Sequence, residues 1–298
     1  MSFLICSDSA DIARLRALVD QQLQGVIDRL FAGEADLAPF AAALRYPIAA
    51  GGKRLRPILL LATVEALGGD VAAAVPSAQA LELMHTFSLV HDDLPALDDD
   101  QLRRGRPTTH VVHGEDVAVL VGDGLVALAF RLLAEDQATP PNVRLAVVAE
   151  LARAVDGMVR GQYLDLRPSL VSDEASLRRT CALKTGFLIQ AGVRMGLALC
   201  SADSVTAAAY ISLAAEIGVG FQIVDDVLDV TSTSDMLGKT VGSDVTNDRR
   251  TFVTVLGLEL ARERADASWA TAARLLDALP GDPRALRAVV ELVYQRDH

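Results

Sequence analysis

The chain has 298 residues, of which 51% are hydrophobic, 39 are acidic and 28 are basic, giving a formal net charge of −11. This length allows one large domain or two small ones, and the apolar content is sufficient for a sizeable core. The acidic balance argues against a nucleic-acid-binding protein, which needs a basic surface stripe. Only three basic residues are lysines, Lys53, Lys184 and Lys239. Such scarcity suggests that these positions need a compact ammonium group rather than any cation.

The remaining composition predicts a soluble, cytoplasmic protein. The three cysteines are widely spaced and form no Cys-x-x-Cys pair, so neither a disulfide framework nor a zinc site is expected. No basic residue precedes Arg14 and no small-residue cleavage motif follows, which predicts no signal peptide. The most apolar stretch, 117–130, is interrupted by a Gly-Asp-Gly sequence. It is shorter than the roughly 18 apolar residues of a membrane span, and none is expected.

Apolar residues recur at three- and four-residue spacing through most of the chain, and strand patterns are nearly absent. In chain order the spacing predicts helices over 11–30, 57–67, 76–93, 116–135, 143–163, 173–199, 204–230, 251–279 and 283–295. Glycine and proline clusters separate these segments, and no long linker or repeat is present. The sequence therefore predicts a single all-α domain over residues 1–298. Several helices are apolar almost all round, which indicates burial in a bundle or at a subunit interface.

An acidic cluster ends the helix predicted over 76–93. The sequence HDDLPALDDD, from His91 to Asp100, holds five carboxylates within nine residues. Asp92 and Asp98 would point about 240° apart in a regular helix, but Pro95 cannot occupy a regular helix interior. A bulge there would bring Asp98 back beside Asp92. A solvated loop explains such a cluster equally well when it is considered alone.

A second acidic cluster lies within the helix predicted over 204–230. In the sequence FQIVDDVLD, four polar residues fall within about 100° on one helical face: Gln222, Asp225, Asp226 and Asp229. An amphipathic surface helix is the ordinary explanation of such a face. However, neighbouring turns offer no Lys or Arg to these carboxylates. The missing counter-charges favour an external cation.

Together the two clusters predict a hard divalent cation and a phosphorylated substrate. Carboxylate oxygens select Mg²⁺ or Mn²⁺ over zinc, and Mg²⁺ completes its shell with water and substrate phosphate. Basic residues that could meet the phosphate lie beside glycines or at helix starts, as phosphate sites require. They occur in GGKRLRP (51–57), LRRGRP (102–107), KTG (184–186) and LGK (237–239).

These motifs in this order resemble the trans-prenyltransferases, the short-chain isoprenyl diphosphate synthases. The resemblance is carried by GGKRLRP (51–57), HDDLPALDDDQLRRGRPT (91–108), GQYLDL (161–166), KTG (184–186), GxGFQIVDDVLD (218–229) and LGK (237–239). It implies an all-α bundle around a deep central cavity, assembled as a homodimer. The implied reaction is head-to-tail addition of isopentenyl diphosphate to an allylic diphosphate, either dimethylallyl or geranyl diphosphate.

The resemblance also implies a role for each matching residue. The metal ligands would be Asp92, Asp98 and Asp225, supported by Asp93 and Asp229. The residues that hold isopentenyl diphosphate would be Lys53, Arg56, His85 and Arg104. Those that hold the allylic diphosphate would be Arg103, Lys184 and Lys239. Catalytic groups near the carbocation would be Lys184, Thr185 and Gln222. The cofactor would be Mg²⁺, with Mn²⁺ as the alternative, and three ions would occupy each site with substrate bound.

The length of the product is expected to depend on Phe87 and Ser88, five and four residues before Asp92. In the family an aromatic residue at the first of these positions stops chain growth near C15, so Phe87 predicts farnesyl diphosphate. The alternative is that Phe87 is an ordinary core residue. The alternative products within the family are geranyl and geranylgeranyl diphosphate.

Three departures from the family pattern bear on chain length rather than on activity. Phe187 follows KTG where a small residue is common, and it is expected to narrow the cavity. Arg249 stands where a Lys is usual, and Val253 replaces a usual Pro.

Two other classes of protein remain possible on sequence grounds. A class I terpene cyclase shares an aspartate-rich motif and Mg²⁺, but its second motif is normally of an Asn/Ser/Glu type and it needs no second diphosphate site. A non-catalytic partner subunit of a synthase typically lacks the aspartates that are present here.

Overall fold

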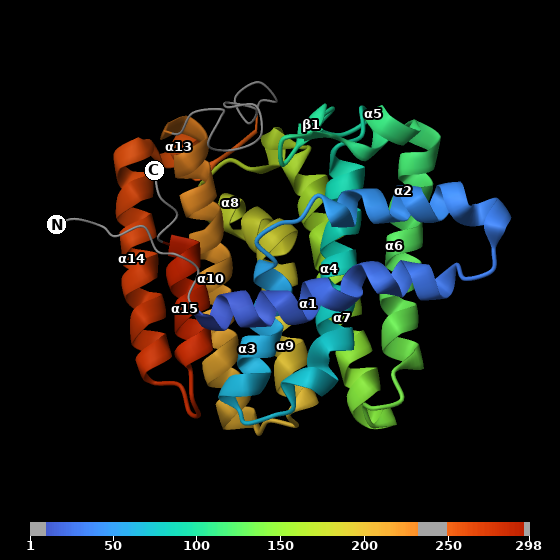
Figure 1. The fold of residues 1–298 in the computed structure, drawn as a ribbon. Helices are drawn as coiled ribbons and strands as arrows, with labels where there is room; N and C mark the ends of the chain where they lie inside the picture. Colours follow the sequence, from blue (N-terminus) through green and yellow to red (C-terminus); the bar gives the residue numbers. More distant parts are fainter. Residues whose placement is uncertain (1–9, 232–248, 295–298) are drawn as a thin grey trace.

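The computed structural model describes residues 10–231 and 249–294, which form a bundle of long helices (Figure 1). The long helices are α1 (Ala10–Leu30), α2 (Ala38–Ala49), α3 (Leu55–Ala66), α4 (Val71–Asp92), α6 (Glu115–Glu135), α7 (Pro141–Asp165), α9 (Phe187–Leu199), α10 (Ser204–Thr231), α14 (Leu258–Asp277) and α15 (Arg284–Tyr294). The short ones are α5 (Thr109–His113), α8 (Glu174–Cys181) and α13 (Phe252–Leu256), with 3₁₀ turns at Ala35–Leu37 and Pro168–Leu170 and a π-helical turn at Ala182–Gly186. The predicted all-α class is confirmed.

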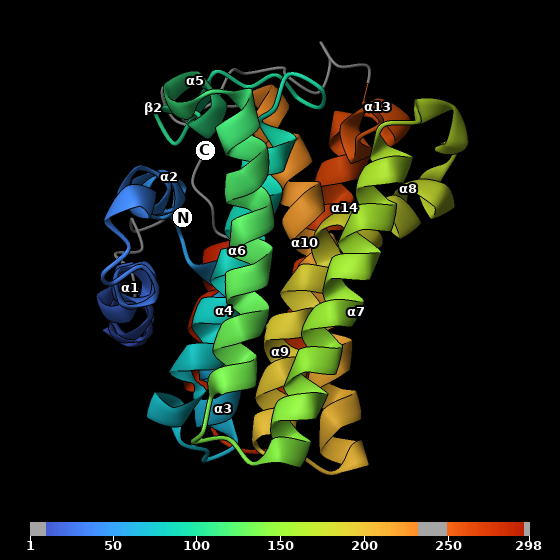
Figure 2. The ribbon, with the colours of Figure 1, turned by 90° about the vertical axis from the view of Figure 1, so that its right-hand side faces the viewer.

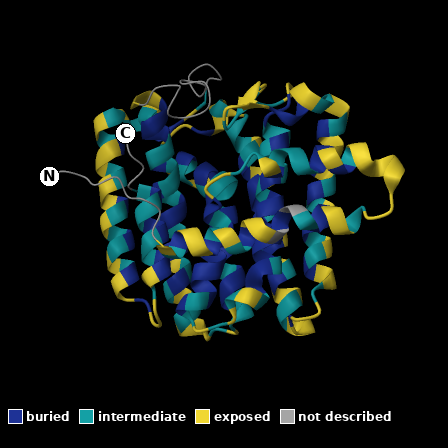
Figure 3. Ribbon diagram, in the orientation of Figure 1, coloured by how far each residue is buried: buried dark blue, intermediate teal, exposed yellow. Residues whose placement is uncertain are grey.

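The long helices are arranged in two groups. Most run in a similar direction, whereas α1 and α2 lie across them (Figure 1) and cover the outside of α3 and α4 (Figure 2). Helix α3 is central to the packing: it contacts α4, α9, α15 and α1, and 10 of its 12 residues are buried. A helix with apolar residues on every side must be enclosed in this way, as the sequence predicts. The buried residues accordingly concentrate in the interior of the bundle (Figure 3).

The predicted helix boundaries need three corrections. Helix α4 begins at Val71 rather than at 76, because the Asp70 carboxylate accepts hydrogen bonds from the amides of Ala72 and Ala73 at 2.9 and 3.2 Å and caps the helix. The segment 251–279 is two helices, broken at Gly257, whose φ is +84°. The segment 173–199 is likewise divided by the π-helical turn. Helices α2 and α5 were not predicted.

Among the described residues, the strands are limited to one two-residue hairpin, β1 (Leu102–Arg103) and β2 (Arg106–Pro107), paired antiparallel. Arg104 and Gly105 form the turn with φ values of +55° and +72°. A two-residue turn with both residues in the left-handed region matches the twist of a hairpin. The hairpin follows the first acidic cluster directly and therefore fixes where the adjacent arginines lie.

Two helices have the length and apolar composition of a membrane span: α6, with a mean hydropathy of 2.1, and α10, with 1.5. The sequence argument that the 117–130 stretch is too short for a span is therefore wrong for α6, which continues to Glu135. Both helices pack within the bundle, α6 against α4 and α10 against α14 and α9. Core helices of globular proteins meet the same criteria of length and composition.

Candidate active site

The end of α4 forms the first acidic wall. The helix stops at Asp92, and the chain then turns so that the Asp98 amide donates a hydrogen bond to the Asp92 carbonyl at 2.9 Å. This return brings Asp98 back to Asp92, as the position of Pro95 predicts, and both carboxylates line a cavity of about 540 Å³. Burial raises the pKa of Asp92 from 3.8 to about 6, against the opposing charge of Lys184 and with the help of Asp98. The wall therefore holds a carboxylate whose charge is less stable here than in water, and a bound cation would offset that cost.

Asp93, next to Asp92, is not among the residues that line this cavity. It is 3% exposed and accepts a hydrogen bond from Arg103 Nε at 2.9 Å. Burial raises the pKa of Asp93, and the neighbouring Arg103 opposes this shift. Asp93 thus holds Arg103, and Arg103 in turn lines the cavity.

The hairpin after the first acidic cluster sends adjacent arginines in different directions. Arg103 lines the 540 Å³ cavity, whereas Arg104 lines a second cavity of about 440 Å³. Arg103 ends strand β1, whereas Arg104 is the first turn residue and has a left-handed backbone conformation, so the two side chains leave the hairpin differently. The two cations can therefore meet two different anionic groups.

Helix α10 forms the second acidic wall, but its carboxylates have different surroundings. Asp225 and Gln222 line the 540 Å³ cavity. Asp226 is 3% exposed and accepts hydrogen bonds from Gln222 Nε2 and from the Phe252 amide, both at 2.7 Å. It therefore joins α10 to α13 and fixes the Gln222 amide. Asp229 is 2% exposed and is not among the residues that line the cavity, so its supporting role stays a prediction.

The fixed amide of Gln222 in turn orients Thr185. Because Gln222 donates to Asp226, its carbonyl oxygen accepts from the Thr185 hydroxyl at 2.9 Å. The Thr185 hydroxyl proton is then engaged in this hydrogen bond. The lone pairs of the same oxygen are left to interact with a ligand in the cavity that Thr185 lines. An oxygen dipole presented in this way suits a cation rather than an anion.

The π-helical turn places Lys184 and Thr185 at the cavity. A π turn adds a residue to a helix and changes the direction of the side chains that follow. Close packing holds the turn: a Cβ atom at Gly161 of α7 would lie 2.1 Å from the Lys184 amide nitrogen, and one at Gly218 of α10 would lie 2.9 Å from the Gly186 Cα. The glycines of the GQYLDL, KTG and GxGFQIVDDVLD motifs therefore all allow close packing around this π-helical turn.

Lys184 and Arg249 share a carboxylate that sequence reasoning left without a role. Asp165, in the GQYLDL motif at the end of α7, accepts from Lys184 Nζ at 2.5 Å and from Arg249 Nη1 at 3.2 Å. Arg249 also pairs with Asp98 on the first acidic wall. The GQYLDL match was the signal available in the sequence, but its partner could not be identified without the fold.

All four residues predicted to hold isopentenyl diphosphate line the second cavity: Lys53, Arg56, His85 and Arg104. This cavity adjoins the first, because Arg56, His85 and Phe221 line both. Carboxylates are absent from its lining among the described residues. The two cavities thus differ in chemistry: the first combines carboxylates with cations, and the second presents cations and a histidine.

His85 lies on the boundary of the two cavities in a defined protonation state. Burial, followed by the charges of Arg56 and Arg104, lowers the pKa of His85 well below its usual value, so the ring is neutral at pH 7. Arg56 Nη1 lies 3.1 Å from His85 Nε2. An arginine can only donate, so Nε2 accepts and Nδ1 carries the proton. Among the described residues this buried N–H has no hydrogen-bond partner, and a ligand oxygen would satisfy it.

Phe87 and Ser88 also line the first cavity. The Phe87 ring packs edge-on against His91 with the centroids 5.1 Å apart, and the Ser88 hydroxyl donates to the His85 carbonyl at 2.8 Å. The ring is therefore held at the cavity surface rather than enclosed in the core. Its effect on product length remains a prediction.

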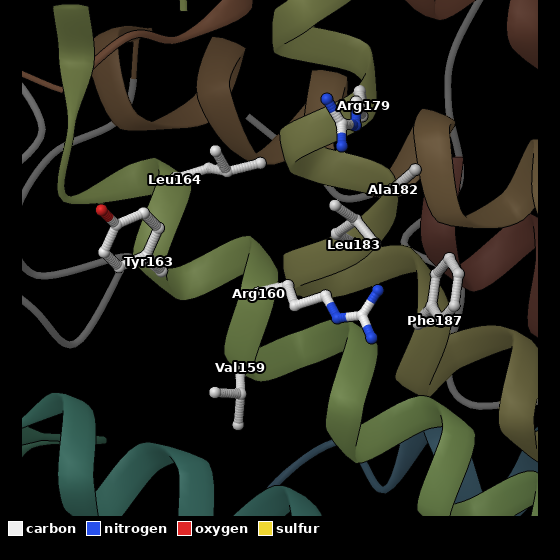
Figure 4. Close-up of a pocket in the computed structure, with 8 residues that line it drawn as sticks. All are labelled: Val159, Arg160, Tyr163, Leu164, Arg179, Ala182, Leu183 and Phe187. Atoms are coloured by element: carbon white, nitrogen blue, oxygen red, sulfur yellow. The ribbon is translucent and has the colours of Figure 1, made fainter. Parts of the chain in front are cut away.

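Phe187 is absent from the lining of the first cavity, and its expected narrowing of that cavity stays a prediction. The side chain packs against Gly157 of α7, where a Cβ atom would lie 2.3 Å from the ring. It lines a neighbouring cavity of about 550 Å³ together with Leu183 (Figure 4), and this cavity shares Val159 and Tyr163 with the first. Val253 lies in the first turn of α13, where a Pro would also be tolerated. Lys239, predicted to hold the allylic diphosphate, lies outside the described residues.

The donor set fits a hard divalent cation. Asp92 at the end of α4, Asp98 in the turn after it and Asp225 of α10 line one cavity, and carboxylate oxygens are what Mg²⁺ prefers. Within the described part of the chain, no three His, Cys, Asp or Glu side chains converge closely enough to hold an ion alone. Such a site is completed by water and by substrate oxygens.

The chain matches a known protein family over most of its length. The sequence profile of the polyprenyl synthetase family matches residues 38–291, and the chain belongs to this family. It is 42% identical over 288 residues to a farnesyl diphosphate synthase of Geobacillus stearothermophilus, covering 94% of this chain and 95% of that one. It is also 42% identical over 228 residues to a geranylgeranyl diphosphate synthase of Cyanophora paradoxa, covering 75% of this chain and 76% of that one.

Among solved structures, the fold is similar to a geranyltransferase of Helicobacter pylori complexed with magnesium and isoprenyl diphosphate. The TM-score is 0.85 at 28% sequence identity, with 99% of this chain and 100% of that chain covered. The cavities described above therefore belong to a prenyltransferase fold.

Proposed function

We propose that this protein is a short-chain prenyltransferase that condenses isopentenyl diphosphate with dimethylallyl and geranyl diphosphate to give farnesyl diphosphate. The observation that carries the proposal is the pair of adjoining cavities, one with carboxylates and cations and one with cations and His85. Two diphosphates with different partners need such a pair. The similarity to a farnesyl diphosphate synthase over 94% of the chain supports the farnesyl product.

The allylic diphosphate would occupy the first cavity. Asp92, Asp98 and Asp225 would bind Mg²⁺, or Mn²⁺ in its place, and we propose three ions per site with substrate bound. The metal supplies positive charge that stabilises the diphosphate leaving group when bound. Asp93 and Asp229 would support the ligands. Arg103, Lys184 and Lys239 would contact the same diphosphate.

Catalysis would begin with breakage of the allylic C–O bond, whose electron pair leaves with the diphosphate. Arg103 and Lys184 stabilise the charge that develops there, as preorganised donors do. The Thr185 oxygen, oriented through Gln222, faces the allylic cation. Apolar side chains of the cavity, including Met158, Leu188 and Phe221, keep water from the cation.

Isopentenyl diphosphate would occupy the second cavity, held by Lys53, Arg56, Arg104 and the His85 Nδ1–H. Its terminal alkene carbon bonds to the allylic carbon, and loss of a proton to the released diphosphate restores a double bond. No protein base is then needed. We further propose that one domain, residues 1–298, performs the reaction in the cytoplasm without a membrane span.

The same chain is proposed to act as a homodimer. Four apolar side chains on α5 and α6 are 41–56% exposed: Val111, Val112, Val119 and Leu120. Exposed apolar groups that cluster on neighbouring elements mark association surfaces. A second copy of this chain would cover them.

Condensation is the direct test of the proposed function. With Mg²⁺, dimethylallyl diphosphate and labelled isopentenyl diphosphate, we expect chromatography to show a C15 product. A C20 product would favour the geranylgeranyl diphosphate synthase alternative, which the Cyanophora paradoxa relative supports. The absence of any condensation, or a cyclised hydrocarbon formed from farnesyl diphosphate alone, would contradict the proposal.

Replacement of Phe87 should change the length of the product. We expect Phe87→Ala to shift the main product from C15 to C20, because the ring lines the cavity and its removal lengthens the space below Asp92. Chromatography of the prenyl products measures this shift. Phe40→Ala is the matched control, since Phe40 packs edge-on against Phe31 at a centroid distance of 6.1 Å and does not line either cavity. A C15 profile in both variants would assign Phe87 to the core.

A further inference from the structure

Arg54 differs from the other basic residues of the GGKRLRP motif in its partners. All of its guanidinium nitrogens donate to protein oxygens: Nε to Asp20 at 2.8 Å, Nη1 to Glu82 at 2.6 Å and Nη2 to the Ile48 carbonyl at 3.0 Å. The side chain is 4% exposed. Arg54 also borders the second cavity, but these three hydrogen bonds commit its guanidinium to joining the loop before α3 to α1, α2 and α4.

The carboxylate that receives Arg54 lies one turn from a ligand-facing residue. Glu82 precedes His85 by three residues on α4, so the two share a helical face, and its side chain is 1% exposed. Its second oxygen, Oε2, has no hydrogen-bond partner among the described residues. An unpaired charge at this depth would be unfavourable, so Glu82 needs the guanidinium of Arg54.

The backbone of the same loop adopts an unusual conformation. Gly51, Gly52 and Arg54 have φ values of +75°, +141° and +51°. Glycine enters this region freely, but a residue with a Cβ atom does so at a cost, and surrounding contacts must hold it there. The three hydrogen bonds of Arg54 provide that restraint. Lys53 lies between the restrained residues, and α3 starts immediately after them.

The loop also fits closely around Arg104. A Cβ atom at Gly52 would lie 2.6 Å from the Arg104 guanidinium, so the path of the loop decides where Arg104 can lie. Burial lowers the pKa of Arg104, and the nearby Glu82 carboxylate opposes this shift. Glu82 thus acts on two arginines of the second cavity, one by contact and one through its charge.

We propose that the buried Arg54–Glu82 ion pair is a positioning device that sets Lys53, Arg56 and Arg104 for the diphosphate bound without metal. Arg54 and Glu82 do not contact substrate in this proposal; they act through the loop. The inference rests on the proposed prenyltransferase function, because that function supplies the second diphosphate. It predicts an effect confined to one of the two substrates.

The test is a comparison of KM values for the two substrates in the full-length enzyme with Mg²⁺. In Arg54→Gln and in Glu82→Gln, we expect KM for isopentenyl diphosphate to rise about 10- to 100-fold, the scale of misplaced binding groups. KM for the allylic substrate, and kcat at saturating isopentenyl diphosphate, should change less than about threefold. The double variant should be no worse than the more affected single variant, since one interaction is lost in each.

The matched control is Arg14→Gln. Arg14 of α1 pairs with Glu65 of α3 at 2.7 Å with both side chains partly exposed, so this variant removes an arginine–glutamate pair far from the cavities. It should leave both KM values unchanged. Thermal unfolding followed by circular dichroism establishes that each variant is folded. If Arg54→Gln does not fold, Glu82→Gln carries the test, because it breaks the ion pair but leaves Arg54 its bonds to Asp20 and to the Ile48 carbonyl.

Two results would overturn the inference. One is an unchanged KM for isopentenyl diphosphate in a folded variant, and the other is an equal rise in both KM values, which indicates general loosening of the fold. Failure of the unaltered enzyme to condense the two substrates would instead contradict the proposed function. The two failures are therefore distinguishable.

Discussion

Asp92→Asn is expected to reduce turnover about 1,000-fold, the scale seen when a principal electrostatic group is removed from an active site. Asp92 and Asp98 are held together by the amide-to-carbonyl bond that closes the turn after α4. Loss of one carboxylate leaves the proposed metal with half of its ligands on this wall. Steady-state condensation assays at saturating Mg²⁺ measure the effect.

Asp99→Asn is the matched control for this loss. It removes the same charge from the same cluster, but Asp99 is exposed and is absent from the cavity lining. Its φ is +53°, a region that asparagine adopts as readily as aspartate. Activity should stay within about twofold of the unaltered enzyme. Equal losses in both variants would show that the cluster acts by its total charge and not through ligands at defined positions.

The Asp92→Asn variant should also be more stable than the unaltered protein in metal-free buffer. The folded-state pKa of Asp92, about 6, exceeds its ordinary value of 3.8, so the folded protein binds this proton more tightly than the unfolded chain. Ionised Asp92 therefore costs folding free energy fully above pH 6, and the cost disappears as the pH falls below 4. At pH 8 we expect the free energy of unfolding to increase by about 2 to 3 kcal/mol in the variant.

Chemical denaturation at pH 8 and pH 4 without Mg²⁺ tests this difference. The gap between the two proteins should be large at the higher pH and small at the lower one. A variant that is less stable at pH 8 would mean that Asp92 is stabilised by its surroundings, and would remove the argument for a strained carboxylate at the metal site.

Lys184→Arg is expected to lower turnover about 100-fold, whereas Arg249→Lys should lower it less than about tenfold. Lys184 belongs to the π-helical turn that packs against Gly161 and Gly218. Its ammonium group lies 2.5 Å from the Asp165 carboxylate. A planar guanidinium is larger and cannot occupy the same position without moving that turn. At Arg249, a lysine can still reach one of the two carboxylates that now share the arginine.

Single-turnover condensation assays measure the chemical step, so they distinguish a slower reaction in these variants from weaker substrate binding. Arg153→Lys, a similar exchange on the exposed side of α7, should leave the rate unchanged. Equal tolerance at positions 184 and 249 would show that the rarity of lysine in this chain has no functional meaning.

The parts of the site that could be predicted are those determined by neighbouring residues in the sequence. Pro95 excludes a regular helix, so the return of Asp98 to Asp92 follows from local chemistry. The helical arc that carries Gln222 and Asp225 is likewise a local property. Local sequence patterns placed each of these motifs on the correct helix or turn. The residues predicted from the motifs therefore line the two cavities.

What could not be predicted depends on the neighbours that a helix meets. Asp226 shares the arc of Asp225, yet it faces α13 and binds the Phe252 amide; periodicity gives the face of a helix but not the partner across it. Phe187 was expected to narrow the first cavity, yet it packs against Gly157 and lines the neighbouring cavity. Asp165 could not be assigned, since both of its partners come from distant parts of the chain.

The orientation of Lys184 and Thr185 depends on the one extra residue that the π-helical turn at Ala182–Gly186 adds to the helix. Deletion of one residue there would let the segment 174–199 continue as a regular α-helix, with its backbone hydrogen bonds in the more favourable pattern. The same deletion would rotate the residues beyond it by about 100° relative to those before it. The overall bundle could survive such an event while Lys184 and Thr185 lost their common orientation. A relative that lacks this one residue could therefore keep the fold and most of the sequence. It would differ from this protein in the orientation of the side chains that correspond to Lys184 and Thr185.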